Sequence, residues 1–365
     1  MLPLIDHLRR RQAIAEQVGD GVLLTTDLTD VRWLTGFVGS SGWAVARGDD
    51  LFVGTDGRYG DKATDETAGC DATVIVERHA SKLHDRLVEL LAGGPVALDP
   101  AATNHDRWLT LACDVELVPS ESPIRAARRV KDHAEIARIE RAASIADAAL
   151  ADVEPEMEGM TELDVRAELE HRMVRFGADD RSYPTIVAAG PENGARPHHG
   201  ASRRTITEGD TVIIDVGALV DGYHSDMTRS WVIGDATEEQ CDTHALVAEA
   251  QRAGLDATTA GASSQAVDAA CRDVFEAAGR LGEYLHGTGH GVGLDIHEVP
   301  FHNRTTDVTL APGMVVTIEP GLYREGFGGF RIEDLVLITE TGHRVLTHSP
   351  KRELSPTCPR SPSTT

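Results

Sequence analysis

Cysteine and long apolar runs are the clearest deficits of this sequence. Five cysteines are dispersed without a CxxC pair, namely Cys70, Cys113, Cys241, Cys271 and Cys358. An odd, scattered set is typical of reduced thiols, which argues against a disulfide framework and a cysteine-ligated zinc site. No apolar run approaches the roughly 18 residues of a membrane helix, and the opening segment MLPLIDHLRRRQ lacks the apolar core of a secretory signal. We expect a cytoplasmic protein without a membrane partner.

Positive charge is also scarce. Lys and Arg total 35 against 59 Asp and Glu, a formal net charge of −24, and lysine occurs only at Lys62, Lys82, Lys131 and Lys351. Such a surface repels nucleic acid and anionic lipid, so no nucleic-acid partner is expected. High-GC coding and adaptation to salt would both produce this bias, and composition does not separate them.

The length of 365 residues predicts two domains. Residues 1–125 alternate strand and helix signals, including a hairpin turning at residues 48–50 and a helix over residues 81–94. Pro119 and Pro123 then mark a linker. We predict an N-terminal α/β domain over 1–125, a C-terminal domain over 130–350 and a disordered tail over 351–365.

Helices and hairpins are mixed in the second domain. Helical spacing occupies residues 131–153, 239–253 and 264–279, and a further helix runs from Thr161 to about Gly177. Asp164, three residues after Thr161, indicates a capping box. Strand signals lie at 183–189, 211–219, 224–233 and from 284 to 346. This order predicts an α+β fold.

The first carboxylate pair lies in the stretch IIDVGALVDGYHSDMTRSW. An Asp221-Gly222 turn signal lies near its midpoint. In a near-symmetric hairpin whose facing residues have numbers adding to 441, Asp215 opposes Asp226. Their side chains would then share one face, with Cβ atoms about 5 Å apart.

A second carboxylate pair lies in TIEPGLYREGFGGFRIEDLVLIT. Glu319 and Glu333 flank a glycine-rich turn centred near Gly326, and their neighbours are apolar. Directly opposed like charges on half-buried strands are destabilising unless something neutralises them. One such pair can be a surface accident, but two pairs on apolar strands point to a shared cause.

A dinuclear metal centre resolves this conflict. Two divalent ions cancel the charge of four carboxylates, which can bridge ions about 3.5–4 Å apart. One neutral imidazole would complete the set, and HGTGHGVGLDIHE (286–298) offers three histidines among glycines too frequent for a helix. Oxygen-rich ligation with one imidazole favours Mn²⁺, with Co²⁺, Fe²⁺ or Zn²⁺ as alternatives.

Together, these stretches resemble the pita-bread metallopeptidases, the family of prolidase, aminopeptidase P, methionine aminopeptidase and the metal-free creatinase. VRWLTGFVGSSGWAV and TDGRY are similar to the creatinase-type N-terminal domain. YPTIVAAGPENGARPHHG, DVGALVDGYHSDMTRSWVIG, HGTGHGVGLDIHEVP, TIEPGLY and RIEDLVLIT are similar to the catalytic domain. The resemblance implies five metal ligands: Asp215, Asp226, His290, Glu319 and Glu333. It makes Asp226 and Glu333 bridging ligands, gives Asp215 to one ion, and gives His290 and Glu319 to the other.

The resemblance also implies roles around the metals. His198 would contact the substrate and steady the tetrahedral intermediate, with the adjacent His199 as the alternative. His297 would shuttle a proton or contact the carbonyl, and His286 would either line the pocket or make a structural hydrogen bond. Alternation along each strand places Thr228 beside Asp226 and Arg331 beside Glu333, where Arg331 could orient a bridging carboxylate.

The implied reaction is amide hydrolysis by a metal-bridging hydroxide, with Glu319 as the proton acceptor. About 125 residues before the catalytic domain favour the proline-specific branch over methionine aminopeptidase. The expected substrates are short proline-containing peptides, cleaved before proline by an Xaa-Pro dipeptidase or an aminopeptidase P. Arg304 is the candidate cation for a dipeptide carboxylate, with a solvated surface arginine as the alternative. A homodimer is expected, in which residues 34–42 close over the partner's site.

Three other functions remain to be compared with this one. A non-peptidase amidohydrolase on the same scaffold, similar to ectoine hydrolase, fits the salt-compatible composition. A metal-free binding module would retain the fold without its ions. A dinucleotide enzyme is disfavoured, because GTGHGVG does not have the G-x-G-x-x-G spacing.

Overall fold

The structure is a computed structural model that describes residues 2–355. The described chain divides into two compact units, Leu4–Arg128 and the part from Arg129 onward with Leu2 and Pro3. Of the predicted tail, residues 351–355 have no helix or strand, and residues 356–365 lie outside the described residues. Within the described part, no helix is both long and apolar enough to cross a membrane.

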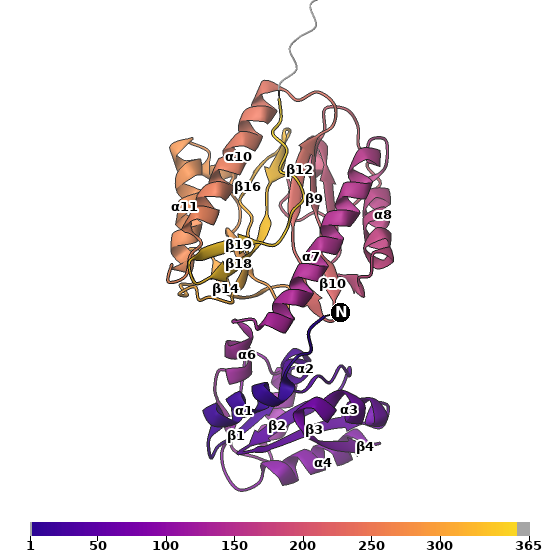
Figure 1. Ribbon diagram of the computed structural model, residues 1–365, viewed down its shortest axis with the longest axis vertical. Helices are drawn as coiled ribbons and strands as arrows, with labels where there is room; N and C mark the ends of the chain where they lie inside the picture. Colours follow the sequence, from indigo (N-terminus) through magenta and orange to yellow (C-terminus); the bar gives the residue numbers. More distant parts are fainter. Residues whose placement is uncertain (1, 356–365) are drawn as a thin grey trace, which may run out of the picture. The chain divides into compact units, whose positions relative to one another are not determined.

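The first unit is built on a six-stranded sheet in the order β4-β3-β2-β1-β5-β6 (Figure 1). Its strands are β1 Val22–Thr25, β2 Trp43–Arg47, β3 Asp50–Asp56, β4 Thr73–Glu77, β5 Val96–Leu98 and β6 Leu117–Pro119. Only β2 runs against its neighbours, which makes this an α/β unit as predicted. Its helices are α1 His7–Val18, α2 Leu28–Thr35, α3 Gly60–Thr67, α4 Ala80–Leu91, α5 His105–Ala112 and α6 Pro123–Arg128.

The linker predicted around Pro119 and Pro123 is wrong. Pro119 is the last residue of β6, and Pro123 begins α6. The end of α6 is held to this unit because Arg128 Nη1 forms a buried ion pair with Asp30 Oδ1 at 2.8 Å. Proline suits the first turn of a helix, where its missing N–H would have no partner.

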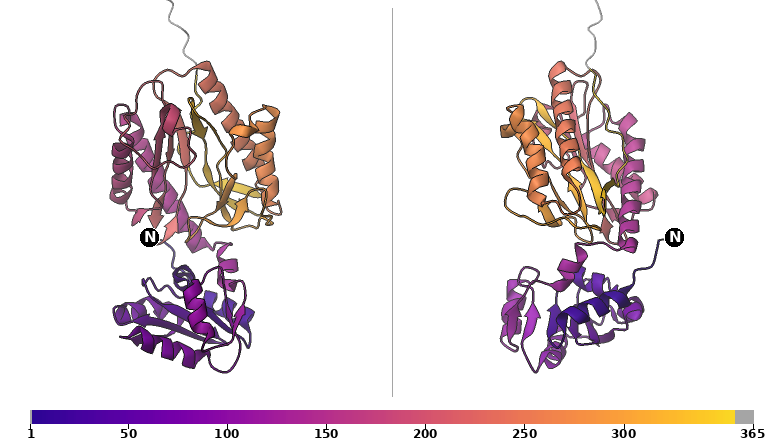
Figure 2. Two further views of the ribbon diagram at one scale, coloured as in Figure 1. Left: turned by 180° about the vertical axis from the view of Figure 1, so that it is seen from behind. Right: turned by 60° about the vertical axis from the view of Figure 1, so that its left-hand side comes forward.

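The second unit combines long helices with antiparallel sheets, which confirms the α+β prediction. Its helices are α7 His133–Val153, α8 Glu162–Arg175, α9 Gly190–Asn193, α10 Glu238–Ala257 and α11 Ser264–Ala277. Figures 1 and 2 show the strands in the middle of this unit, with α7 and α8 along one half and α10 and α11 along the other. The predicted capping box is confirmed, since Thr161 and Asp164 bond reciprocally at the start of α8.

The described strands of this unit form four sheets, in the orders β12-β9-β8, β14-β13-β15-β18-β19, β11-β10-β7 and β16-β17. The strands of the first part are β7 Asp180–Arg181, β8 Ile186–Ala189, β9 Thr211–Asp215, β10 Ala218–Val220, β11 Tyr223–His224 and β12 Thr228–Val232. Those of the second part are β13 Gly289–Gly291, β14 Glu298–His302, β15 Val315–Ile318, β16 Gly321–Arg324, β17 Gly328–Arg331, β18 Asp334–Thr339 and β19 Gly342–Val345.

The first hairpin differs from its predicted register by two residues. Asp215 faces Thr228, not Asp226. Asp221 and Gly222 both have positive φ, 47° and 76°, and form a two-residue turn between the paired Val220 and Tyr223. That turn fixes the register further along the chain than the predicted midpoint. A shift of two residues leaves every side chain on its predicted face, so Asp215 and Asp226 become diagonal neighbours.

The second hairpin has the predicted register. Ile318 pairs with Asp334 in β15–β18, and Gly321 pairs with Arg331 in β16–β17. Glu319 and Glu333 lie between these two ladders, where the chain passes from one sheet to the other. Both carboxylates are therefore held by paired strands on either side.

Candidate metal centre

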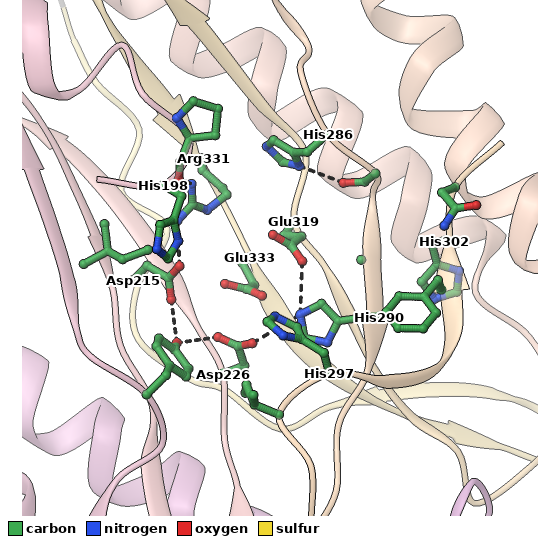
Figure 3. A pocket seen from close by; sticks show the side chains of 18 of the residues that line it. His198, Asp215, Asp226, His286, His290, His297, His302, Glu319, Arg331 and Glu333 are labelled. Carbon is green, nitrogen blue, oxygen red and sulfur yellow. Dashed lines mark hydrogen bonds and ion pairs between the residues drawn. The ribbon is translucent and has the colours of Figure 1, made fainter. Parts of the chain in front are cut away.

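A cavity of about 470 Å³ in the second unit opens between its β12-β9-β8 sheet and its five-stranded sheet. Five of its lining residues are the predicted metal ligands Asp215, Asp226, His290, Glu319 and Glu333. The predicted site residues His198, His286, His297 and Arg331 line it as well. Figure 3 shows these side chains converging from several strands on one space. Its volume falls in the range of about 300–1,000 Å³ that is usual for small-molecule sites.

Three of these residues can offer ligand atoms to one ion. Ligand atoms of Asp226, His290 and Glu333 all lie within 4.8 Å of one another, and all three side chains are buried. His290 Nε2 lies 3.5 Å from Asp226 Oδ2 and 3.4 Å from Glu319 Oε1. The strand pairing thus brings together His290 of β13, Glu333 just before β18 and Asp226 in the loop before β12.

The tautomer of His290 suits a metal ligand. Its Nδ1 lies 3.0 Å from the Gly291 carbonyl oxygen, which can only accept, so Nδ1 carries the hydrogen. Burial lowers the pKa of His290, which keeps the ring neutral. The lone pair on Nε2 therefore faces carboxylate oxygens. Acceptors facing acceptors are unfavourable unless a cation lies between them, and a divalent ion fits this donor set.

Desolvation and mutual repulsion both raise the pKa values of the clustered carboxyl groups. Burial, with the nearby charges of Asp215 and Glu319, raises the pKa of Asp226 well above its ordinary value. Burial and the charge of Asp226 do the same to the pKa of Glu333. Burial also raises the pKa of Glu319. Without cations, these groups favour binding protons.

Thr228 and Arg331 support this cluster, although Arg331 does so differently from the prediction. Thr228 Oγ1 donates to Glu333 Oε2 at 2.7 Å, and Arg331 Nε donates to Thr228 Oγ1 at 3.0 Å. The ion pair of Arg331 is with Asp215, whose Oδ2 lies 2.7 Å from Nη2. The hydrogen-bonded link from Arg331 to Glu333 runs through Thr228, while the positive charge of Arg331 opposes the rise that burial causes in the pKa of Asp226 and Glu333.

The sequence interpretation missed Tyr183. Its hydroxyl bonds to Asp215 Oδ1 at 2.5 Å and also to Asp226 Oδ1, so it links two of the predicted ligands. Burial raises the pKa of Tyr183 well above its ordinary value, so the hydroxyl keeps its proton. One sequence feature could have pointed to Tyr183: it begins a tyrosine-proline pair shortly before the apolar run IVAA, which forms β8.

Tyr323 was also missed, and it explains His286. Nδ1 of His286 lies 2.7 Å from the Gly287 carbonyl oxygen and therefore carries the hydrogen, so Nε2 accepts from the Tyr323 hydroxyl at 2.8 Å. Arg331 Nη1 donates to the same hydroxyl at 2.9 Å. Both nitrogens of His286 are engaged, which supports its structural alternative, although the ring still lines the cavity.

The structure separates His198 from His199. His198 lines the cavity, whereas His199 turns its Nε2 to within 3.8 Å of Glu162 Oε2. The loop that carries His198 is fastened by Arg331, whose Nη1 donates to the Pro197 carbonyl oxygen at 2.9 Å. Geometry therefore favours His198 as the substrate contact.

Of the two predicted pocket residues His297 and Arg304, only His297 lines the cavity. His297 lines the cavity with its ring edge against that of His290, at 4.4 Å between centroids. Burial, reinforced by His290, lowers the pKa of His297. Arg304 is exposed and is not among the lining residues. Its position fits the alternative of a solvated surface arginine, and its neighbour Asn303 lines the cavity instead.

Comparison with known families identifies the family to which a chain with this site belongs. Residues 137–340 match the model of metallopeptidase family M24, and residues 7–130 match that of the creatinase/prolidase N-terminal domain. The chain belongs to metallopeptidase family M24. As an M24 peptidase it is a hydrolase with peptide substrates, and the family implies divalent metal ions at the cluster described above.

Relatives cover nearly the whole of this M24 peptidase. An uncharacterised peptidase of Bacillus subtilis is 37% identical over 352 residues, which is 94% of this chain and 98% of the relative. A solved Xaa-Pro dipeptidase from Bacillus anthracis has a TM-score of 0.89 and 31% identity, covering 95% of this chain and 98% of the other. An X-Pro aminopeptidase from Thermotoga maritima has a TM-score of 0.85 and 29% identity, covering 94% and 99%. The ectoine-hydrolase-like alternative is not favoured by these relatives.

We predict that Tyr183→Phe lowers metal affinity without unfolding this M24 peptidase. The substitution removes the hydroxyl that holds Asp215 and Asp226 in position but keeps the buried ring. Groups that orient metal ligands typically contribute 10- to 100-fold in affinity or activity. Titration of metal-free protein with Mn²⁺, followed by activity, should show a loss of about that size. A variant with unchanged metal affinity would contradict this role.

Proposed function

We propose that this M24 peptidase hydrolyses the peptide bond preceding proline. One observation carries the proposal: a buried cluster of Asp226, His290 and Glu333 lies in a peptide-sized cavity. Solved relatives that cover more than nine-tenths of the chain include an Xaa-Pro dipeptidase and an X-Pro aminopeptidase.

The metals would be held by Asp215, Asp226, His290, Glu319 and Glu333. Mn²⁺ is the proposed ion, because four carboxylates and one imidazole form a hard, oxygen-rich donor set. Two bound divalent ions neutralise the four carboxylates, lower the pKa of a water molecule and polarise the scissile carbonyl. Thr228, Tyr183 and Arg331 orient the carboxylates through the hydrogen bonds already described.

Glu319 is the proposed proton acceptor. Its Oε1 accepts from Thr317 Oγ1 at 3.1 Å, which fixes the carboxylate, and burial raises its pKa. A carboxylate with a raised pKa accepts a proton from water more readily than an ordinary carboxylate does, and it can then pass that proton to the leaving nitrogen. His198 and His297 would donate to the carbonyl oxygen as charge develops there.

The walls of the cavity fit selection for proline. Pro184, Ile186 and Phe301 supply apolar surface near the carboxylates. A prolyl amide has no N–H, so an apolar subsite accepts its ring without leaving a donor unpaired. A secondary amide in the same place would bury an N–H that needs an acceptor.

We predict that His198→Ala lowers kcat/KM by about 100-fold, whereas His199→Ala changes it little. Only His198 lines the cavity. The two variants remove the same side chain from adjacent positions, so each is the control for the other. Steady-state hydrolysis of an Xaa-Pro peptide measures the difference. Equal losses in both variants, or a larger loss in His199→Ala, would overturn this assignment.

A peptide panel with Mn²⁺-loaded protein tests the proposed function. Ala-Pro, Gly-Pro, Ala-Pro-Ala and Met-Ala should be compared at one enzyme concentration, with ectoine as the non-peptide control. Turnover of the proline peptides alone is expected. Hydrolysis of Ala-Pro but not Ala-Pro-Ala would make the enzyme a dipeptidase, and the reverse an aminopeptidase. Failure to cleave any Xaa-Pro peptide would contradict the proposed specificity for the bond preceding proline.

We also propose a cytoplasmic homodimer. The dispersed cysteines favour a reducing compartment, and all four that the structure describes are free.

The dimer is proposed because the catalytic cavity has no free cation of its own among its described lining residues. Arg331 is the only cation among them, and it is paired with Asp215. A substrate carboxylate would need a cation from outside this cavity. Light scattering after size exclusion tests the dimer, and a monomer at micromolar concentration would contradict it.

A further inference from the structure

Asn303 lines the catalytic cavity and has no part in the chemistry described above. It follows directly after β14, whose last residue, His302, pairs with Gly289 of β13. In the same ladder Phe301 pairs with His290, one of the proposed metal ligands. Paired strands therefore hold the chain just before Asn303, which lies about 7 Å along it from the residue that faces His290.

The side-chain amide of Asn303 has one defined orientation. Its Oδ1 accepts from the backbone N–H groups of Thr305 and Thr306, at 2.8 and 2.9 Å, and from their hydroxyl groups at 2.9 and 3.0 Å. A backbone N–H can only donate, so the atom that faces it is the oxygen and the other is the NH₂ group. No group in the described part of the chain accepts from Nδ2, which is not sealed from solvent. The half-buried Asn303 thus provides a free, neutral donor in the cavity lining.

No lysine or arginine among the described lining residues is free to pair with a substrate carboxylate. Arg331 is paired with Asp215, and Arg304 is exposed and lies outside the lining. A carboxylate that leaves water without a charged partner loses far more hydration free energy than a neutral carbonyl group does. One neutral amide N–H returns only a small part of that loss. The donor at Asn303 therefore suits a carbonyl oxygen better than a carboxylate.

We propose that Asn303 determines specificity by selecting peptides that continue beyond proline. In the proposed function, the scissile carbonyl lies at the metals beside His290, and the proline ring lies against an apolar wall that includes Phe301. The next polar group of the substrate, the carbonyl that follows the proline ring, then accepts from Asn303 Nδ2. In a longer peptide this group is a neutral amide, whereas in a dipeptide it is a carboxylate. The inference rests on the proposed function and narrows it to an Xaa-Pro aminopeptidase.

Two substrates that differ only in this group, Ala-Pro and Ala-Pro dimethylamide, test the selection. The dimethylamide keeps the carbonyl oxygen after the proline ring but has neither a charge nor an N–H at that end. The full-length enzyme loaded with Mn²⁺ should cleave it with a kcat/KM at least about tenfold higher than that for Ala-Pro. An equal or higher kcat/KM for Ala-Pro would overturn the proposal and show that a cation from outside this cavity binds the carboxylate. Cleavage of neither substrate would instead contradict the proposed function, and this inference with it.

Asn303→Asp tests the residue itself. The substitution is nearly isosteric, because it keeps the oxygen that accepts from Thr305 and Thr306 and replaces only the NH₂ donor by a charged oxygen. We expect kcat/KM for the dimethylamide to fall by about tenfold or more. The loss should appear in KM rather than in kcat, because the contact is remote from the bond that breaks. A purely structural role of Asn303 in the turn would leave KM unchanged, since aspartate makes the same turn.

Arg304→Gln is the matched control. It makes the same segment more negative by the same amount as Asn303→Asp, but Arg304 is exposed and outside the lining. Its KM for the dimethylamide should equal that of the wild type. Elemental analysis and circular dichroism of each preparation establish metal content and folding. The proposal is overturned if Asn303→Asp, folded and with full metal content, keeps the wild-type KM, or if Arg304→Gln raises KM by as much.

Discussion

Glu333→Ala will lower kcat/KM for an Xaa-Pro peptide by more than about 1,000-fold and reduce the bound metal. Glu333 is 1% exposed, and it is one of the three residues whose ligand atoms come together at one point. Its carboxylate also accepts from Thr228, so its loss removes the hydrogen-bonded link from Arg331 through Thr228 to this carboxylate, while Arg331 stays paired with Asp215. Steady-state kinetics and elemental analysis of the same preparations measure the two effects.

The control for this variant is Glu340→Ala. Glu340 lies seven residues further along the chain, in the turn between β18 and β19, and is exposed. It changes the same charge on the same chain without touching the cavity, so it should retain full activity and metal content. A Glu333→Ala variant that keeps full activity would refute the site assignment.

Removing the metals will make the stability of the protein depend strongly on pH. Burial and mutual repulsion raise the pKa of Asp226 and Glu333 in the metal-free fold. A carboxyl group with a raised folded-state pKa contributes stability that is present below its unfolded pKa and is lost as pH rises through the folded pKa. The Tm of metal-free protein should therefore fall as pH rises above the ordinary carboxyl pKa toward the raised pKa of Asp226 and Glu333. At the higher pH it should lie below that of metal-loaded protein, by about 2–4 °C for each kcal/mol that the bound ions contribute to a unit of this size.

Metal-free Glu333→Gln separates this effect from the general charge of the chain. The net charge of −24 also destabilises the folded state as carboxylates ionise, but the substitution leaves that background almost unchanged. Its Tm should vary less with pH than that of the metal-free wild type. Calorimetry of both proteins across the range measures the slopes. A metal-free wild type whose Tm is constant or rises with pH would contradict the prediction.

The site could be located from sequence because the alternation of side chains along paired strands places its carboxylates on one face. Glu319 and Glu333 had to face each other once their flanking apolar strands paired about Gly326, and the pairing of Ile318 with Asp334 has that register. The register of the first hairpin was wrong by two residues, since turn type, not segment symmetry, sets it. An even shift keeps each side chain on its face, so both aspartates still reach the cavity.

Contacts between segments far apart in the chain could not be predicted from strand periodicity. Tyr183 lies 32 residues before Asp215, and its role depends on where β8 places its hydroxyl. The choice between His198 and His199 depends on an irregular loop that Arg331 fastens from another hairpin. Arg304 was assigned from its nearness in sequence to His297, but the chain after β14 carries it to the surface.

By itself, the sequence determined the α+β class, the acidic composition and two pairs of buried carboxylates that require neutralisation. Those features follow from local periodicity and from the cost of opposing like charges, which hold wherever the strands lie. Only the tertiary structure decided which groups surround the carboxylates. It brought Tyr183 between two aspartates, directed Arg331 to Asp215 and placed Asn303 in the lining of the catalytic cavity. Such contacts join residues far apart in the chain, and their geometry is set by how whole sheets and helices pack.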